Sequence, residues 1–269
     1  MTDARPRHVL DLIAMKREGR RIAVLTAYDA LFARLLDEVG IDVLLVGDSA
    51  NQVLAGQPTT LNASLDQMIY HAASVRRGAP DALVIVDLPF LSYQVSVEDA
   101  IRNAGRVMRE TGANGVKLEG GRPIASTIRA LVDVGIPVMG HLGLTPQSVH
   151  ALGGYRVQGR ELERAEEMVR DAQALEEAGA CAIVLELMPS ALAERISRAL
   201  TIPTIGIGAG AGCDGQVLVL HDMLGLNDRF KVKFLKKYAE LADAVRDAAR
   251  KYADEVRSGK YPGKEHGFK

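Results

Sequence analysis

The chain of 269 residues is nearly neutral, with 33 basic and 34 acidic residues and a net charge of −1. This balance offers no electrostatic attraction for nucleic acid or an anionic membrane, and no apolar run reaches the roughly 18 residues of a membrane span. Only two cysteines occur, Cys181 and Cys213, which excludes a disulfide framework and favours a reducing, cytoplasmic setting. Hydrophobic residues make up 48%, enough for one large domain with a sizeable core.

Short apolar runs alternate with longer amphipathic stretches, which is the pattern of parallel βα units. The runs are continuously apolar, as expected of strands that are buried on both faces. Eight such runs in a chain of this length predict an α/β fold, a single-domain (β/α)₈ TIM-type barrel over residues 1–269. The predicted strands are Ile22–Thr26, Val43–Val46, Leu83–Val86, Gly115–Leu118, Pro137–Gly140, Ala182–Leu185, Thr204–Ile207 and Val217–Leu220.

Helical spacing of apolar residues predicts the helices between these strands. About eight residues separate the seventh and eighth runs, too few for a normal crossover helix, so either this helix is vestigial or a predicted strand boundary is wrong there. A long polar helix near the C-terminus is expected to close the barrel or to pack on a neighbour. The predicted helices are Ser64–Arg77, Val97–Thr111, Ile124–Asp133, Glu161–Ala178, Ala191–Leu200 and Lys231–Arg257.

Ionisable residues gather where the predicted strands end, which is where a parallel barrel places its active site. Lys117 and Glu119 lie two residues apart, so both side chains should point to the same face of their strand and enter the barrel mouth together. The candidates at the strand ends are Asp48, Asp87, Lys117, Glu119, His141 and Glu186.

Three of these acids, Asp48, Asp87 and Glu119, offer only oxygen ligands, which suit Mg²⁺ better than Zn²⁺. Strand-end aspartates can instead cap the following helices. Three carboxylates from three different strands favour the metal site.

Glu186 lies in an apolar frame, where desolvation favours the protonated carboxyl and can tune a general base. The alternative is a carboxylate that pairs with a nearby Lys or Arg. His141 follows a predicted strand and is either a hydrogen-bonded structural residue or a catalytic one.

Longer motifs around these residues resemble the ketopantoate hydroxymethyltransferase family. The resemblance runs from about Leu10 to Gly267, with the motifs ordered and spaced as in the family. The matching segments are Thr26-Ala27-Tyr28-Asp29, Leu45-Val46-Gly47-Asp48-Ser49, Asp87-Leu88-Pro89-Phe90, Lys117-Leu118-Glu119-Gly120-Gly121, the run from Gly140 to Ser148, the run from Gly153 to Arg160, Glu186, Ile205 to Gly210, Asp214-Gly215-Gln216 and Tyr261-Pro262-Gly263.

The resemblance implies a (β/α)₈ enzyme that uses Mg²⁺ and the co-substrate 5,10-methylenetetrahydrofolate. The enzyme would add a hydroxymethyl group to 3-methyl-2-oxobutanoate and so form ketopantoate, the first step of pantothenate biosynthesis. The family also implies a homo-oligomer, often a decamer, whose partners are a small 2-oxo acid and a folate. By position, the metal ligands would be Asp48, Asp87 and Glu119, the last through water, and the proton acceptor would be Glu186. Substrate contacts would come from Asp48, Ser49, Asp87, Lys117 and His141.

Two other functions are compatible with a barrel of this kind. One is a Mg²⁺-dependent lyase or mutase of the phosphoenolpyruvate mutase and isocitrate lyase group, although the cysteine-bearing loop frequent there has no clear counterpart here. The other is a non-catalytic regulator or scaffold, which the complete set of ionisable residues disfavours. The segment 50–63 departs from the family's usual loop, while the metal and base positions match.

Overall fold

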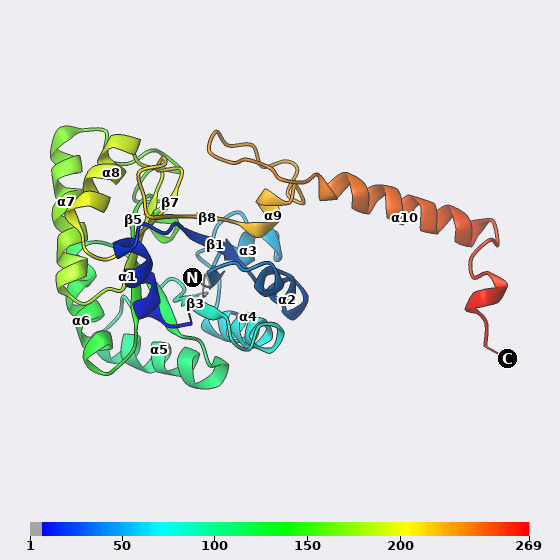
Figure 1. Ribbon diagram of the computed structural model, residues 1–269, viewed down its shortest axis with the longest axis horizontal. Coiled ribbons are helices and arrows are strands. Elements are labelled where there is room, and N and C mark those ends of the chain that lie inside the picture. The colour runs from blue at the N-terminus through cyan, green and yellow to red at the C-terminus, as the bar shows by residue number, and fades with distance from the viewer. Residues whose placement is uncertain (1–6, 269) are drawn as a thin grey trace. The chain divides into compact units, whose positions relative to one another are not determined.

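The structure, a computed structural model, describes residues 7–268. Within them, eight strands pair in parallel and in chain order, and the last strand pairs with the first. The predicted (β/α)₈ barrel is therefore confirmed. Figure 1 shows the strands at the centre of this unit, with helices such as α5, α6 and α7 on the outside. The strands are β1 (Ile22–Thr26), β2 (Val43–Val46), β3 (Leu83–Asp87), β4 (Gly115–Glu119), β5 (Val138–Gly143), β6 (Ala182–Glu186), β7 (Thr204–Ile207) and β8 (Gly215–Leu218).

The helices of the barrel unit begin and end on local signals. Ser64 and Ser96 accept hydrogen bonds from backbone N–H groups of the following turns, and Gly112 ends its helix in the left-handed region with φ 71°. These ends agree with the prediction to within a few residues. The helices are α1 (Val9–Arg17), α2 (Ala30–Glu38), α3 (Ala50–Val53), α4 (Leu65–Gly78), α5 (Val97–Thr111), α6 (Ala125–Asp133), α7 (Leu162–Glu177) and α8 (Ser190–Ala199), with the 3₁₀ turns η1 (Arg122–Ile124) and η2 (Pro146–Ser148).

The interior of the barrel is a packed apolar core. Side chains from the strands, among them Val24, Leu83 and Ile205, form one buried cluster. Leu12 and Met15 of α1 belong to the same cluster, so this helix covers the N-terminal ends of the strands with apolar side chains. The opposite end, where the strands finish, carries the ionisable residues. The fold thus leaves one end of the barrel for chemistry.

Five strands differ from the predicted ranges: β3, β4 and β6 each end one residue later, and β5 and β8 differ by two residues or more at one end or both. β5 continues to Gly143, so His141 lies within the strand rather than after it. β8 begins at Gly215 and ends at Leu218, two residues earlier than predicted at each end. Residues 208–214, between β7 and β8, hold no helix, and the boundary predicted for the eighth strand was wrong as well.

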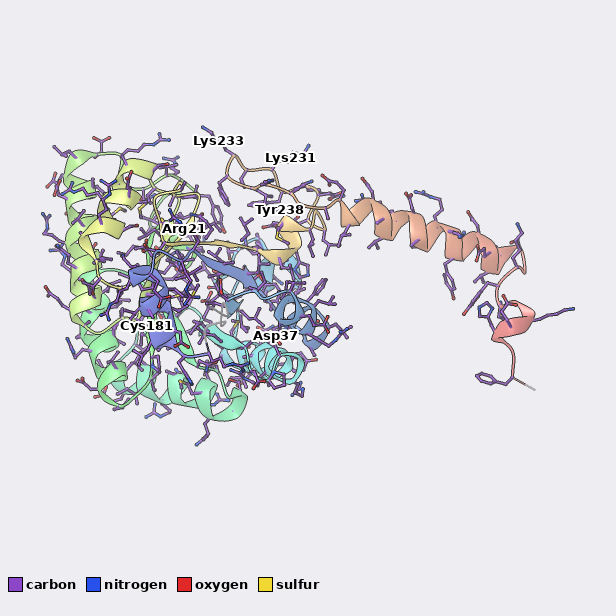
Figure 2. The ribbon with its side chains drawn as sticks, viewed as in Figure 1. Arg21, Asp37, Cys181, Lys231, Lys233 and Tyr238 are labelled. Atoms are coloured by element: carbon purple, nitrogen blue, oxygen red, sulfur yellow. The ribbon has the colours of Figure 1, made fainter. Side chains whose placement is uncertain are left out.

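Residues 220–268 form a second compact unit, with α9 (Leu220–Met223), α10 (Leu241–Arg257) and a final turn, η3 (Lys264–His266). The predicted helix from Lys231 was wrong over its first ten residues. Lys231 and Lys233 lie on an irregular segment before α10 (Figure 2). Closely spaced lysines repel one another and alternate with β-branched and aromatic residues, which disfavours a helix there. That residues 1–269 form a single domain stays a prediction.

No helix within residues 7–268 is both long enough and apolar enough to cross a membrane. Both cysteines are buried and free, and Cys181 directly precedes β6.

Candidate active site

Two aspartates from neighbouring strands lie against each other at the barrel mouth. The backbone N–H of Asp48, just after β2, donates to Oδ2 of Asp87, at the end of β3, over 3.1 Å. A Cβ at Gly47 would lie 2.7 Å from Oγ of Ser49, so this glycine leaves room for the Ser49 hydroxyl beside the pair. Burial, followed by the charges of Asp87 and Glu119, raises the pKa of Asp48 to about 8. Burial likewise raises the pKa of Asp87. Both carboxylates are therefore destabilised as anions without a cation.

Lys117 on β4 supplies one positive charge to this pair. Its Nζ lies 3.0 Å from Oδ1 of Asp87 and 3.2 Å from Nδ1 of His141, and its side chain is only 4% exposed. Burial disfavours the ammonium, but the carboxylates of Asp87 and Glu119 outweigh it and raise the pKa of Lys117. Oε1 of Glu119 lies 3.4 Å from the same Nδ1, so Lys117 and Glu119 enter the mouth together, as strand parity predicted.

His141 joins these groups to Glu186. Its Nε2 lies 3.2 Å from Oε2 of Glu186, whose side chain is 15% exposed, and its Nδ1 faces Glu119. Burial and the charge of Lys117 oppose protonation, yet the two flanking carboxylates raise the pKa of His141 to about 9. The histidine therefore bridges two acids from different strands.

The backbone around Glu186 is tightly constrained. Gly143, with φ 97°, ends β5 where a Cβ would collide with the carbonyl of Glu186. Leu187, the next residue, has φ 44°, a left-handed conformation that non-glycine residues rarely adopt. Its N–H donates to Ile207, and its carbonyl accepts from the N–H of Gln158. Glu186 is held at the end of β6 by its neighbours on both sides.

The predicted candidates thus come together, with one difference for Ser49. Its Oγ lies 2.8 Å from the hydroxyl of Tyr28, a buried residue directly after β1, rather than on one of the acids. Ser49 therefore borders the acids without joining their network.

Two polar residues that the sequence reasoning missed lie inside the network. Gln147, in η2 after β5, donates from Nε2 to Oδ2 of Asp48 over 3.0 Å. The hydroxyl of Tyr93 lies 2.8 Å from Oε1 of Gln147 and accepts from the N–H of Glu119 over 3.0 Å. A proline that starts a turn three residues after an active-site strand, here Pro146, is the one signal that could have drawn attention to Gln147.

Comparison with known proteins identifies the family. The family model described as ketopantoate hydroxymethyltransferase matches residues 7–264. A protein of Pelobacter propionicus named 3-methyl-2-oxobutanoate hydroxymethyltransferase is 54% identical over 269 residues, covering 100% of both chains. One of the same name from Moorella thermoacetica is 57% identical over 258 residues, covering 96% of each chain. The chain belongs to the ketopantoate hydroxymethyltransferase family. It is accordingly an enzyme, a hydroxymethyltransferase.

Solved structures of the rival group share the fold of this family member. A phosphonopyruvate hydrolase in complex with oxalate and Mg²⁺ has a TM-score of 0.62 at 15% identity, covering 93% of this chain and 87% of the other. A 2,3-dimethylmalate lyase of the phosphoenolpyruvate mutase and isocitrate lyase superfamily has a TM-score of 0.62 at 18% identity, covering 96% and 91%. These likenesses concern the fold alone. The much higher identity to hydroxymethyltransferases decides between the two enzymatic functions.

The segment 50–63, which departs from the usual loop of the ketopantoate hydroxymethyltransferases, consists of the short helix α3 and a hydrogen-bonded loop. Asn51 is buried, and its Nδ2 donates to the carbonyl of Thr59 and to Oδ1 of Asn62. Nε2 of Gln52 donates to the hydroxyl of Tyr155 over 3.2 Å, which joins this loop to the β5–α7 connection. The departure leaves the positions of the acids intact.

The acids suit a hard cation, although no group of three or more His, Cys, Asp or Glu within the described part of the chain is arranged to hold a metal. Oδ1 of Asp87 and Oε1 of Glu119 are buried and accept no hydrogen bond of good geometry, even though each has a cationic group within 3.4 Å. Mg²⁺ commonly takes only one or two protein carboxylates and completes its shell with water and substrate. Asp48 and Asp87 meet that requirement.

Proposed function

We propose that this chain transfers a hydroxymethyl group from 5,10-methylenetetrahydrofolate to 3-methyl-2-oxobutanoate and forms ketopantoate, the first step of pantothenate biosynthesis. Its family membership supports this reaction. The observation that carries the proposal is the convergence of buried acids and one lysine at the barrel mouth, from strands far apart in the sequence. Such a cluster combines a cation site with a proton acceptor.

The first chemical problem is the C3–H bond of the 2-oxo acid, which is too weakly acidic for a carboxylate acting alone. Each pKa unit of mismatch costs about 1.4 kcal/mol. Mg²⁺ held by Asp48 and Asp87 would act as a Lewis acid at the oxo group and contribute several kcal/mol. Glu119 would complete the site from further out, through water, as its position in the family pattern implies.

Lys117 would act as a permanent positive charge toward the substrate. The raised pKa keeps its amine protonated, and Asp87 fixes it at 3.0 Å. An ammonium contacts the carboxylate or oxo oxygen of the substrate but cannot attack a carbonyl carbon. A Schiff-base mechanism would need the neutral amine, which these surroundings disfavour. Ser49 and His141 would complete the substrate contacts.

Glu186 would accept the C3 proton. It is the one acid of the network that is not fully buried, and it lies at the end of β6, facing the mouth. His141 contacts it on one side and orients the carboxylate. The carbanion at C3 would then attack the methylene carbon of the folate, forming the new C–C bond. One methylene C–N bond of the folate would break as the C–C bond forms, and hydrolysis of the other by one water molecule would give the hydroxymethyl group of ketopantoate and release tetrahydrofolate.

Several expectations about the surroundings of the enzyme stay predictions. They are a homo-oligomer such as a decamer, a cytoplasmic location, and the absence of nucleic-acid and membrane partners.

Product analysis tests the proposed function. The protein is incubated with 3-methyl-2-oxobutanoate, Mg²⁺ and 5,10-methylenetetrahydrofolate, and the mixture is analysed by NMR and mass spectrometry. We expect ketopantoate and tetrahydrofolate in equal amounts, and neither when any one component is omitted. Cleavage of 2,3-dimethylmalate or phosphonopyruvate in place of this transfer would assign the chain to the lyase group.

A further inference from the structure

Gln147 connects two acids of the site, although the proposed reaction gives it no part. It is only 5% exposed and lies in the turn that follows β5. Its Nε2 donates to Oδ2 of Asp48 over 3.0 Å and to the carbonyl of Leu88 over 2.9 Å. Its backbone N–H donates to Oε2 of Glu119 over 2.9 Å. Gln147 alone, in the turn that follows β5, therefore fixes two carboxylates that come from the ends of β2 and β4.

The orientation of the Gln147 amide is determined by its partners. Oε1 accepts from Nε2 of Gln94 over 3.2 Å and faces the hydroxyl of Tyr93 at 2.8 Å. A reversed amide would set its oxygen against the Asp48 carboxylate and the Leu88 carbonyl, which are both acceptors. Both N–H groups and the carbonyl oxygen are in use, so this side chain has a single satisfied orientation.

The hydroxyl of Tyr93 contacts both Gln147 and the backbone of Glu119. The side chain of Tyr93 is 2% exposed, and its hydroxyl accepts from the N–H of Glu119 over 3.0 Å. Burial, reinforced by the charge of Glu119, raises the pKa of Tyr93, so the hydroxyl keeps its proton and can donate to Gln147. The network is continuous from the end of β4, through Tyr93 and Gln147, to Asp48.

The consequence concerns the Asp48 carboxylate. Its Oδ2 is occupied by Gln147, whereas no hydrogen bond within residues 7–268 reaches Oδ1. We propose that Gln147 is a positioning residue that holds Asp48 with Oδ1 free for a divalent cation, and that Tyr93 holds Gln147 in turn. The inference rests on the cation site of the proposed function and deepens it.

Binding of Mn²⁺ to the full-length protein, followed by electron paramagnetic resonance without substrate, tests the role of Gln147. Gln147→Met keeps the length of the side chain and the backbone N–H but removes both amide donors. We expect its Mn²⁺ dissociation constant to rise about tenfold, as for other residues that orient metal ligands. At saturating metal, C3 exchange of the 2-oxo acid should recover most of its rate. The matched control is Gln158→Met, because the Gln158 side-chain amide donates to the carbonyl of Arg156 and to no other group within residues 7–268. Its Mn²⁺ dissociation constant should equal that of the wild type.

Circular dichroism checks that each variant is folded. A folded Gln147→Met protein with the wild-type Mn²⁺ constant would overturn the positioning role. If Gln147→Met does not fold, Tyr93→Phe decides, since it keeps the buried ring and removes only the hydroxyl. Weaker Mn²⁺ binding then supports the proposal, and an unchanged constant overturns it. A wild-type protein that binds no Mn²⁺ would instead contradict the cation site of the proposed function.

Discussion

Each end of the barrel holds a lysine paired with an aspartate, but the two pairs have opposite surroundings. At the N-terminal end of the strands, Nζ of Lys16 lies 3.0 Å from Asp214 and donates to the carbonyls of Ser197 and Ile202 over 2.7 and 2.9 Å. Its three donors have three acceptors. At the mouth, Lys117 faces several acids whose buried oxygens remain unsatisfied. The first pair is complete without a ligand, whereas the second has an excess of negative charge.

The two pairs show that the N-terminal end of the barrel contributes to stability, whereas the C-terminal end carries the functional groups. A satisfied ionic group stabilises the structure and needs nothing further, so its loss should lower the free energy of unfolding. An unsatisfied cluster costs stability and persists where a ligand completes it. Substitutions of the same kind at the two ends should therefore have different effects.

The largest expected difference concerns two glutamates. Glu186→Gln keeps the size of the side chain but removes the proton acceptor, so exchange of the C3 hydrogen in deuterated water should slow by roughly 10²–10⁴-fold. Binding of the 2-oxo acid should persist. Glu176→Gln is the matched change at the other end, where Oε1 accepts from Thr201 and Ile202. It should lower the melting temperature and leave exchange unchanged. Normal exchange in Glu186→Gln would assign the base to another residue, His141 first.

Two aspartates provide the second pair. Asp87→Asn removes a charge from the cation site and from Lys117, and should reduce Mg²⁺-dependent exchange by about 10²–10³-fold. Asp214→Asn weakens the pair with Lys16 and should affect thermal stability alone. Exchange rates at several Mg²⁺ concentrations measure both effects. Full activity of Asp87→Asn after treatment with a chelator would rule out the cation site.

The sequence predicted the parts of this comparison that depend on local pattern. Continuous apolar runs predicted every strand, and the spacing of Lys117 and Glu119 predicted their shared face. The network of Gln147 and Tyr93 could not be predicted, because it depends on hydrogen bonds between segments far apart in the chain. The extension of β5 past His141 was also missed, since glycine and histidine interrupt an apolar run without ending the hydrogen-bond ladder.

The excess negative charge at the barrel mouth should make the melting temperature depend on pH. In the folded, metal-free protein the pKa of Asp48 is raised from 3.8 to about 8. The contribution of the protonated Asp48 to the free energy of unfolding is therefore full below about pH 4 and is lost as the pH rises through 8. His141, raised from 6.5 to about 9, acts in the same direction. With a chelator present, the melting temperature should fall by roughly 5 °C between about pH 6 and pH 9. Asp48→Asn should reduce this fall of the melting temperature with pH. A fall identical to that of the wild type would contradict the raised pKa of Asp48.

The smallest expected effect is a null result at Lys117. Its protonated amine should form no imine, so borohydride added during turnover should leave the mass of the protein unchanged. Intact-mass measurement followed by peptide mapping gives the answer. A reduced substrate adduct on Lys117 would replace the proposed chemistry with a Schiff-base mechanism.

The central claim is that the acid-rich end of the barrel is an enolising site that requires a cation. The most direct measurement is ¹H NMR of 3-methyl-2-oxobutanoate in deuterated water with the wild-type protein and no folate. We predict loss of the C3 proton signal when Mg²⁺ is present and retention of the signal when a chelator replaces it. Exchange that is equally fast with and without Mg²⁺, or absent under both conditions, would contradict the account.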